Sequence, residues 1–282
     1  MSAKTRNVIR FVKGSPTMDG AGVNLTRVIG TRELLDLDPF LLLDEFKSEE
    51  AKDYIAGFPS HPHRGFETIT YLLHGNFRHR DSRGNEGFLT AGSVQWMTAG
   101  RGIIHSEMPE MTEGLVWGYQ LWLNLPAKDK MTEPRYQDIA PDQIPVVDKA
   151  GVTVKVIAGD YRGQTGPSKT WIPALYFDVS LASNTSFEHP IPDELTSFAY
   201  VIEGQAQFGS AEKSYPGQAG NLLIFGEGDD IEVATGESPA RFLLLAAKRL
   251  NEPIVRGGPF VMNTREELAQ AFQDYQDGTL DQ

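Results

Sequence analysis

The sequence predicts a mainly β protein built from two similar halves and ending in a single helix. Short alternating or apolar runs, separated by Gly, Pro, Asn and Asp, occupy most of the chain, as in FETITYLLHG and GSVQWMTAG. Two segments of the first half recur in the second half in the same order. A capped amphipathic pattern near the C-terminus is the one clear helix signal.

Length and composition indicate a globular protein with a sizeable core. A chain of 282 residues suggests about two domains, or one large barrel. The formal net charge of −12 disfavours unspecific attraction to nucleic acid or to an anionic membrane surface. No apolar run approaches a membrane span, and the first residues lack the apolar core of a signal peptide. We therefore expect a cytoplasmic protein that binds neither nucleic acid nor membrane directly.

The strands of the first half are indicated by turn residues and by alternation. The segment DSRGNEG, residues 81–87, separates two strand-like runs and predicts a hairpin connection. The segment GLVWGYQLWLNLP, residues 114–126, alternates with the two-residue period of a strand. Gln120, a polar group among apolar and aromatic neighbours, either faces a pocket or belongs to an outward polar face.

The internal repeat defines the predicted domains. HPHRGFETITYLLHG at 61–75 resembles HPIPDELTSFAYVIEG at 189–204, and AGSVQWMTAGRGIIHSE at 91–107 resembles AGNLLIFGEGDDIEVAT at 219–235. A Pro-rich and charged stretch separates the copies. We predict an N-terminal domain over 1–130, a linker over 131–150, and a C-terminal domain over 151–282 that includes the terminal helix.

The terminal helix is expected to start at the segment NTREEL. Thr264 and Glu267 have the spacing of a capping box, and Gly278 marks the end of the pattern. One apolar stripe follows the cap and consists of Leu268, Ala271, Phe272 and Tyr275. The polar face is rich in Glu, Gln and Asp, so we interpret the helix as a packing element and not as a membrane-surface helix.

Two short motifs predict a metal site. HPHRGFE carries His61 and His63, and RGIIHSEMPE carries His105 and Glu107. On a strand, side chains two residues apart point to one face, so each motif presents a pair of donors. An isolated HxH more often marks exposed histidines at a strand edge, but the second pair favours a site of three imidazoles and one carboxylate. The chain has no cysteine, which excludes thiolate ligands and disulfides.

The remaining histidines and one further carboxylate are weaker candidates. Glu67 lies four residues after His63 and shares its face unless Gly65 introduces a bulge, and we favour a ligand set without it. His79 borders a polar turn and is expected to be solvated. His189 persists in the second copy, where the positions matching the second motif are Ile231, Val233 and Thr235. We predict that this half binds no metal.

The segments GFPSHPHRGFETITYLLHG and AGRGIIHSE resemble the two motifs of a cupin barrel. From LDPFLLLDEF through QWMTAGRGIIHSEMP to GPFVMNT, nearly the whole chain resembles the pirin family of bicupins. The resemblance implies an all-β fold of two tandem cupin barrels, jelly-roll-like, with a short C-terminal helix. It also implies one metal in the N-terminal domain, held by His61, His63, His105 and Glu107.

The same resemblance implies a function. Family members cleave flavonols such as quercetin with O₂, so we expect a quercetin 2,3-dioxygenase activity with Glu107 as both ligand and general base. Fe(II) is the expected metal, with Mn, Ni, Cu, Co and Zn as alternatives. The predicted substrate contacts are Phe46, Phe58, Met97 and Gln120. The alternative is a non-enzymatic, iron-binding regulatory protein whose oxidation state changes its affinity for a protein partner.

Overall fold

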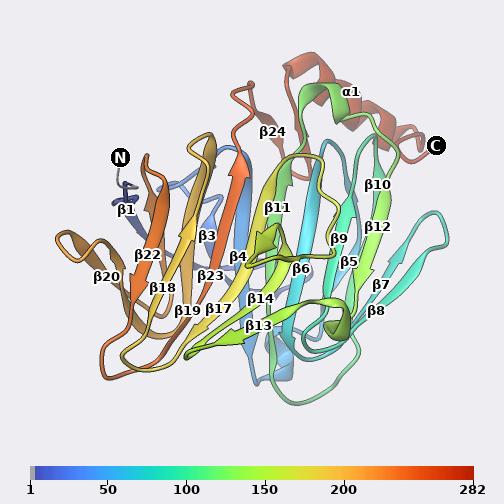
Figure 1. Cartoon of the computed structure of the whole chain (residues 1–282). Coiled ribbons are helices and arrows are strands. Elements are labelled where there is room, and N and C mark those ends of the chain that lie inside the picture. Colours follow the sequence, from blue (N-terminus) through green and yellow to red (C-terminus); the bar gives the residue numbers. More distant parts are fainter. Residues whose placement is uncertain (1–3) are drawn as a thin grey trace. The chain divides into compact units, whose positions relative to one another are not determined.

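The computed structural model describes residues 4–282 and divides the chain into two compact units. We call residues 15–141 with 250–282 the first barrel, and residues up to 14 with 142–249 the second barrel. Each unit is built mainly from antiparallel strands, most of which are labelled in Figure 1. The all-β class, the two tandem barrels and the C-terminal helix are therefore confirmed.

The larger sheet of the first barrel has seven strands. Its central strand β11 pairs with β4 on one side and with β6 on the other. In sheet order the strands are β12 (Arg135–Ile139), β9 (Val94–Thr98), β6 (Phe66–His74), β11 (Val116–Asn124), β4 (Phe40–Ser48), β3 (Val23–Ile29) and β2 (Ser15–Asp19). Eight of the nine residues of β6 are buried, as expected for a strand covered on both faces.

The smaller sheet of the first barrel carries both histidine motifs. Its order is β5 (Phe58–His63), β10 (Ile103–Pro109), β7 (Phe77–Asp81) and β8 (Glu86–Leu89). Strands β7 and β8 form the predicted hairpin around residues 81–87. Strands β5 and β10 pair so that His61 faces His105. Strand pairing thus brings together two motifs that lie about forty residues apart in the sequence.

Gly65 follows β5 for a steric reason. Its φ is +90°, and a Cβ added there would lie 2.0 Å from the carbonyl oxygen of Val261. The neighbouring Arg64 forms a parallel bridge with Phe260. A side chain at position 65 would therefore push the C-terminal segment away from the first histidine motif.

The C-terminal segment of the first barrel contains β24 (Val255–Gly257), β25 (Phe260–Met262) and helix α1 (Arg265–Gln276). The predicted capping box of Thr264 and Glu267 is present. Ala271 is buried, and the Phe272 ring lies 5.0 Å from that of Phe260. Three 3₁₀ turns complete the described chain, at Ala51–Asp53, Ala127–Asp129 and Pro141–Gln143.

The second barrel contains one ten-stranded sheet and one small ribbon. Its main path is β1 (Val8–Lys13), β21 (Asn221–Phe225), β19 (Leu195–Gly209), β23 (Ala240–Lys248), β17 (Ala174–Leu181), β14 (Val152–Ala158) and β13 (Val146–Lys149). Three more strands join it, namely β18 (Ser186–Pro190), β20 (Ser214–Gln218) and β22 (Asp230–Ala234). The ribbon is β15 (Asp160–Tyr161) with β16 (Gln164–Thr165). A large cluster of aliphatic and aromatic side chains fills the interior.

The units differ from the predicted domain ranges at both ends of the chain and in the predicted linker. Strand β1 pairs with β21 of the second barrel, whereas α1 and residues 250–282 belong to the first barrel. Within the predicted linker, β12 pairs with β9 and β13 pairs with β14, so the segment is shared between two sheets. Strand pairing decides which barrel each segment belongs to. Strands β1 and β21 are far apart in the sequence, so the sequence alone does not show this assignment.

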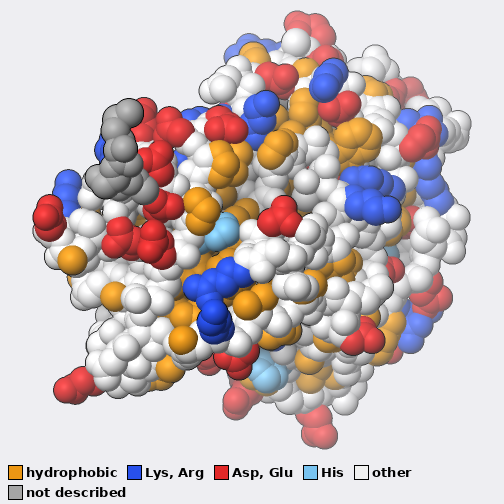
Figure 2. All heavy atoms as spheres, in the orientation of Figure 1, with side chains coloured by type: hydrophobic (Ala, Val, Ile, Leu, Met, Phe, Trp, Pro, Cys, Tyr) orange, Lys and Arg blue, Asp and Glu red, His pale blue; other side chains and the backbone are white. Residues whose placement is uncertain are grey.

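The surface agrees with the acidic composition. Figure 2 shows acidic and basic side chains interspersed with small hydrophobic groups over one face of the molecule. Among residues 4–282, no helix combines the length and the apolar character needed to cross a membrane.

Candidate metal centre and its cavity

Three imidazoles meet where β5 and β10 pair. His61 and His63 come from β5 and His105 comes from β10, and their potential ligand atoms all lie within 4.8 Å of one another. The ring centroids are 4.4 Å apart for His61 and His105 and 5.0 Å apart for His63 and His105. The three histidines predicted from the sequence therefore form one cluster.

The hydrogen bonds of His61 and His63 orient their rings for ligation. His61 Nδ1 lies 2.8 Å from the carbonyl oxygen of Pro59, and His63 Nδ1 lies 3.3 Å from that of Pro259. A carbonyl oxygen only accepts, so each Nδ1 carries the proton and donates. This tautomer leaves the Nε2 lone pair of each ring for a metal ion, as in metal sites whose histidines donate to the backbone.

The His105 ring is oriented by another histidine, in contrast to the carbonyl oxygens that orient His61 and His63. Its Nδ1 lies 3.4 Å from His79 Nδ1, and its Nε2 is buried without a hydrogen-bond partner among the described residues. If His105 binds an ion through Nε2, its Nδ1 donates to His79. The expectation of a solvated His79 is wrong, because β7 pairs with β10 and leaves this side chain 2% exposed.

The electrostatics of the cluster favour neutral imidazoles. Burial, with the neighbouring histidines, lowers the pKa of His63 and of His105 well below the usual value. Neutral imidazole is the form that binds metal. Three converging imidazoles, one with an orphaned buried nitrogen, fit a borderline divalent transition metal.

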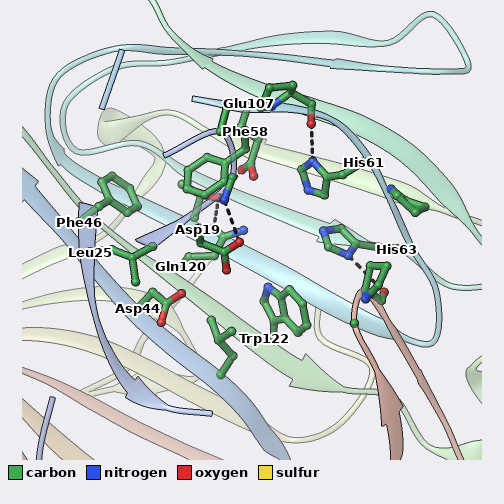
Figure 3. A pocket seen from close by; sticks show the side chains of 18 of the residues that line it. Asp19, Leu25, Asp44, Phe46, Phe58, His61, His63, Glu107, Gln120 and Trp122 are labelled. Atoms are coloured by element: carbon green, nitrogen blue, oxygen red, sulfur yellow. Dashed lines mark hydrogen bonds between the residues drawn. The ribbon is translucent and has the colours of Figure 1, made fainter. Parts of the chain in front are cut away.

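Glu107 lies near this cluster but not within it. The three-histidine group does not include its carboxylate. Its side chain is 8% exposed, and Thr70 Oγ1 lies 3.1 Å from Glu107 Oε1. In Figure 3 it lies near His61 at the edge of the cavity. Ligation by Glu107 therefore stays a prediction.

Glu67 lies elsewhere in the barrel wall. Its side chain is fully buried, and its Oε1 accepts a hydrogen bond of 2.7 Å from Thr98 Oγ1. Burial raises its pKa to about 7. It is not one of the residues that form the metal-binding group.

A cavity of about 600 Å³ opens beside the histidines within the first barrel. This volume is typical of a small-molecule site. Its walls combine apolar and polar side chains, shown in part in Figure 3. The lining includes Phe46, Phe58, His61, His63, Glu107 and Gln120. Three of the four predicted substrate contacts therefore lie in one cavity with three of the four predicted ligands, His61, His63 and Glu107.

The fourth predicted contact, Met97, lies elsewhere. It is fully buried and packs with Ala99, Ile103 and the partly buried Tyr136. It is not among the residues that line the cavity, so we do not include it in the proposed site.

Gln120 faces the cavity, which decides between its two interpretations in favour of the pocket. Among the lining residues that sequence reasoning missed are Arg27, Asp44, Thr70, Trp122 and Arg256. Two of them had a signal: Asp44 is the first carboxylate after an apolar run in FLLLDEF, and Trp122 shares the alternating face of Gln120. Arg256 had none, because its place depends on the return of the C-terminal segment to the first barrel.

Two barrels of antiparallel strands, one of them with a three-histidine centre beside a cavity, define a bicupin with one candidate metal site. Residues 22–123 match the Pirin family, and residues 176–281 match the Pirin C-terminal cupin domain. The chain belongs to the pirin family.

Its relatives are similar along nearly their whole length. A pirin-like protein of Caulobacter vibrioides is 50% identical over 276 residues, covering 97% of this chain and 98% of that protein. The pirin of Homo sapiens is 44% identical over 274 residues, covering 96% and 92%. The crystal structure of a quercetin 2,3-dioxygenase from Acinetobacter baumannii has a TM-score of 0.88 and 33% identity, covering 98% of each chain.

Proposed function

We propose that the protein is a metal-dependent dioxygenase that cleaves flavonols such as quercetin with O₂. The observation that carries this proposal is the convergence of three imidazoles at the wall of a cavity large enough for a small aromatic molecule. The similar Acinetobacter baumannii protein, described as a quercetin 2,3-dioxygenase, supports the same reaction.

The histidines hold the metal. His61, His63 and His105 present Nε2 atoms, and the acceptors at their Nδ1 atoms fix the rings. When bound, a divalent ion, with Fe(II) as first candidate and Mn, Ni, Cu, Co or Zn as alternatives, supplies Lewis acidity that favours the deprotonated hydroxyl of a flavonol.

Glu107 is the proposed proton acceptor. It lines the cavity beside the histidines, where the 3-hydroxyl of a chelating hydroxy-ketone is expected. Thr70 holds one of its oxygens and leaves the other for a ligand or a proton. Glu107 then combines two roles, as a fourth metal ligand and as the general base.

The apolar wall of the cavity binds the rings. Phe46 and Phe58 line it, and the Trp122 indole lies between the histidines and the opposite end in Figure 3. Aromatic rings favour contact with a planar substrate and exclude water from the reacting end.

Oxygen uptake tests the proposal. Protein loaded with Fe(II) is expected to consume O₂ when quercetin is added, and metal-free protein is not. His105→Ala is expected to lose both metal and uptake. A matched control is His74→Ala, since this exposed histidine stacks on Trp117 away from the cluster. Failure of the loaded protein to consume O₂ with any flavonol would instead favour the iron-binding regulatory protein.

A further inference from the structure

A row of polar side chains crosses the cavity wall. Arg27 of β3 faces Asp44 of β4, Asp44 faces Gln120 of β11, and Gln120 faces Thr70 of β6. Residues that face each other across neighbouring strands lie on the same side of a sheet. All four line the cavity, and we call them the polar row.

The polar row runs from the metal centre to the remote end of the cavity. At one end, Thr70 contacts Glu107. At the other end, Asp44 lies two strand spacings from Thr70, which is about 10 Å. In Figure 3, Asp44 lies at the opposite end of the cavity from His61 and His63. A ligand that chelates the metal therefore has to be elongated to reach Asp44.

The remote half of the polar row has hydrogen-bonding capacity left for a ligand. Arg27 donates to both oxygens of Asp44, from Nε at 2.9 Å and from Nη2 at 2.7 Å. Each carboxylate oxygen accepts a second hydrogen bond. Thr70 Oγ1 lies 2.6 Å from the Gln120 amide, and the other end of that amide remains for a ligand.

Apolar side chains cover the space beside the row. Leu25 and Phe46 lie close to Asp44 in Figure 3, and Phe58 lines the same cavity. The remote end thus has apolar walls and a polar edge. This pattern suits a flat aromatic ring with hydroxyl groups on its rim.

We propose that the polar row selects flavonols that carry hydroxyl groups remote from the chelating hydroxy-ketone. Asp44 accepts a hydrogen bond from a phenolic hydroxyl, and the Gln120 amide contacts the same ring. This inference rests on the proposed function and narrows its substrate class. A buried site built to bind a hydroxyl rejects the analogue without it, because the site's polar groups then lose a partner.

The second barrel contains a control for a purely structural role of Asp44. There Arg241 holds Asp178 with the same geometry, from Nε at 2.9 Å and from Nη2 at 2.7 Å. Asp178 lies in β17, is 1% exposed in its side chain, and is not a lining residue of the first-barrel cavity. If Asp44 only holds an arginine, substitution of either aspartate should have the same consequences.

Ligand binding in the absence of O₂ tests the inference. The full-length, metal-loaded protein is titrated with quercetin and with 3-hydroxyflavone, which has the chelating end but no remote hydroxyl. Quenching of tryptophan fluorescence reports Kd, since Trp122 lines the cavity. We expect Asp44→Asn and Gln120→Leu each to weaken quercetin binding about tenfold and 3-hydroxyflavone binding less than about twofold. Asp178→Asn should change neither.

The outcomes separate the inference from the proposed function. Equal weakening of both ligands, or no weakening of quercetin, in the two cavity variants would overturn the inference even if the wild type cleaves flavonols. An equal effect of Asp178→Asn would overturn it too. If Asp44→Asn does not fold, Gln120→Leu decides alone. Hydroxyl-dependent binding without any O₂ uptake would support the polar row and contradict the dioxygenase function.

Discussion

The same strand pairing brings three histidines together in one barrel and packs an apolar core in the other. In the first barrel, β5 and β10 place His61 opposite His105. In the second barrel, β18 and β22 place His189 opposite Ile231 and Phe187 opposite Val233. The His189 ring packs 5.0 Å from Phe177 and is 9% exposed.

This difference indicates that the folding of such a barrel does not require metal-ligating histidines. A barrel of this type folds around aliphatic and aromatic side chains at the ligand positions, as the second barrel does. In the first barrel His63 and His105 are buried beside the partly buried His61, and a buried nitrogen without a partner, such as His105 Nε2, costs free energy. Their presence there is best explained by an ion that they bind.

The largest expected effect concerns Glu107, the carboxylate of the second motif in the first barrel. Glu107→Gln keeps the shape and an oxygen but removes the charge and the basic site. Turnover per bound metal ion should fall by roughly 10²- to 10⁴-fold. The measurement is O₂ uptake with metal content determined on the same sample. Wild-type turnover per metal ion in this variant would leave Glu107 without a role in proton transfer.

Metal binding should stabilise the barrels unequally. An ion that binds only the folded first barrel, at about 100 times its Kd, adds about 2.7 kcal/mol to that barrel's free energy of unfolding. Hydrogen exchange with and without metal resolves the two barrels. We expect added protection in β5 and β10 and no change in β18 and β22. Global unfolding on chelation would contradict the view that each barrel has a sufficient core of its own.

His79 should influence metal affinity without being a ligand. His79→Phe removes the acceptor for His105 Nδ1 and should weaken metal binding by about 10- to 100-fold. His79→Asn, which keeps an acceptor, should recover part of the loss. Recovery separates an effect on the orientation of His105 from a loss of packing. If the two variants bind metal equally well, His79 does not orient the ligand.

The smallest expected effect is the acid sensitivity of the second barrel. Burial lowers the pKa of His189 to about 4 from an ordinary 6.5. The unfolded chain therefore takes up this proton at a higher pH than the folded protein does. The contribution of the neutral, buried His189 to the free energy of unfolding is complete above pH 6.5 and is lost as the pH falls towards 4. In His189→Leu, the decline in unfolding free energy between about pH 7.5 and 5.5 should shrink by about 1 kcal/mol. An unchanged pH slope would show that His189 does not titrate on unfolding.

Much of this comparison could be predicted from the sequence. Alternation and the repeat predict the strands and the two similar halves, the resemblance to the pirin family implies that each half is a barrel, and the spacing of two motifs predicts the three histidines. Of the three residues predicted at the second motif of the second copy, Ile231, Val233 and Thr235, the first two lie in β22, opposite His189 and Phe187.

Other features depend on long-range pairing that leaves no local pattern. The start of the chain belongs to the second barrel because β1 pairs with β21. The end of the chain belongs to the first barrel, where Asp274 forms an ion pair of 2.6 Å with Arg64. His79 looked solvated because its turn is polar, yet β10 covers it. Met97 was predicted as a substrate contact, but its side chain is enclosed in a small apolar cluster.

The most direct test of the central claim is metal stoichiometry in matched variants of the two barrels. Protein purified without added metal, His105→Ala and His189→Ala are analysed for bound transition metals by elemental analysis. We predict about one ion per chain in the wild type and in His189→Ala, and almost none in His105→Ala. Two ions per chain, or loss of metal from His189→Ala with metal retained in His105→Ala, would contradict the assignment of a single metal centre to the first barrel.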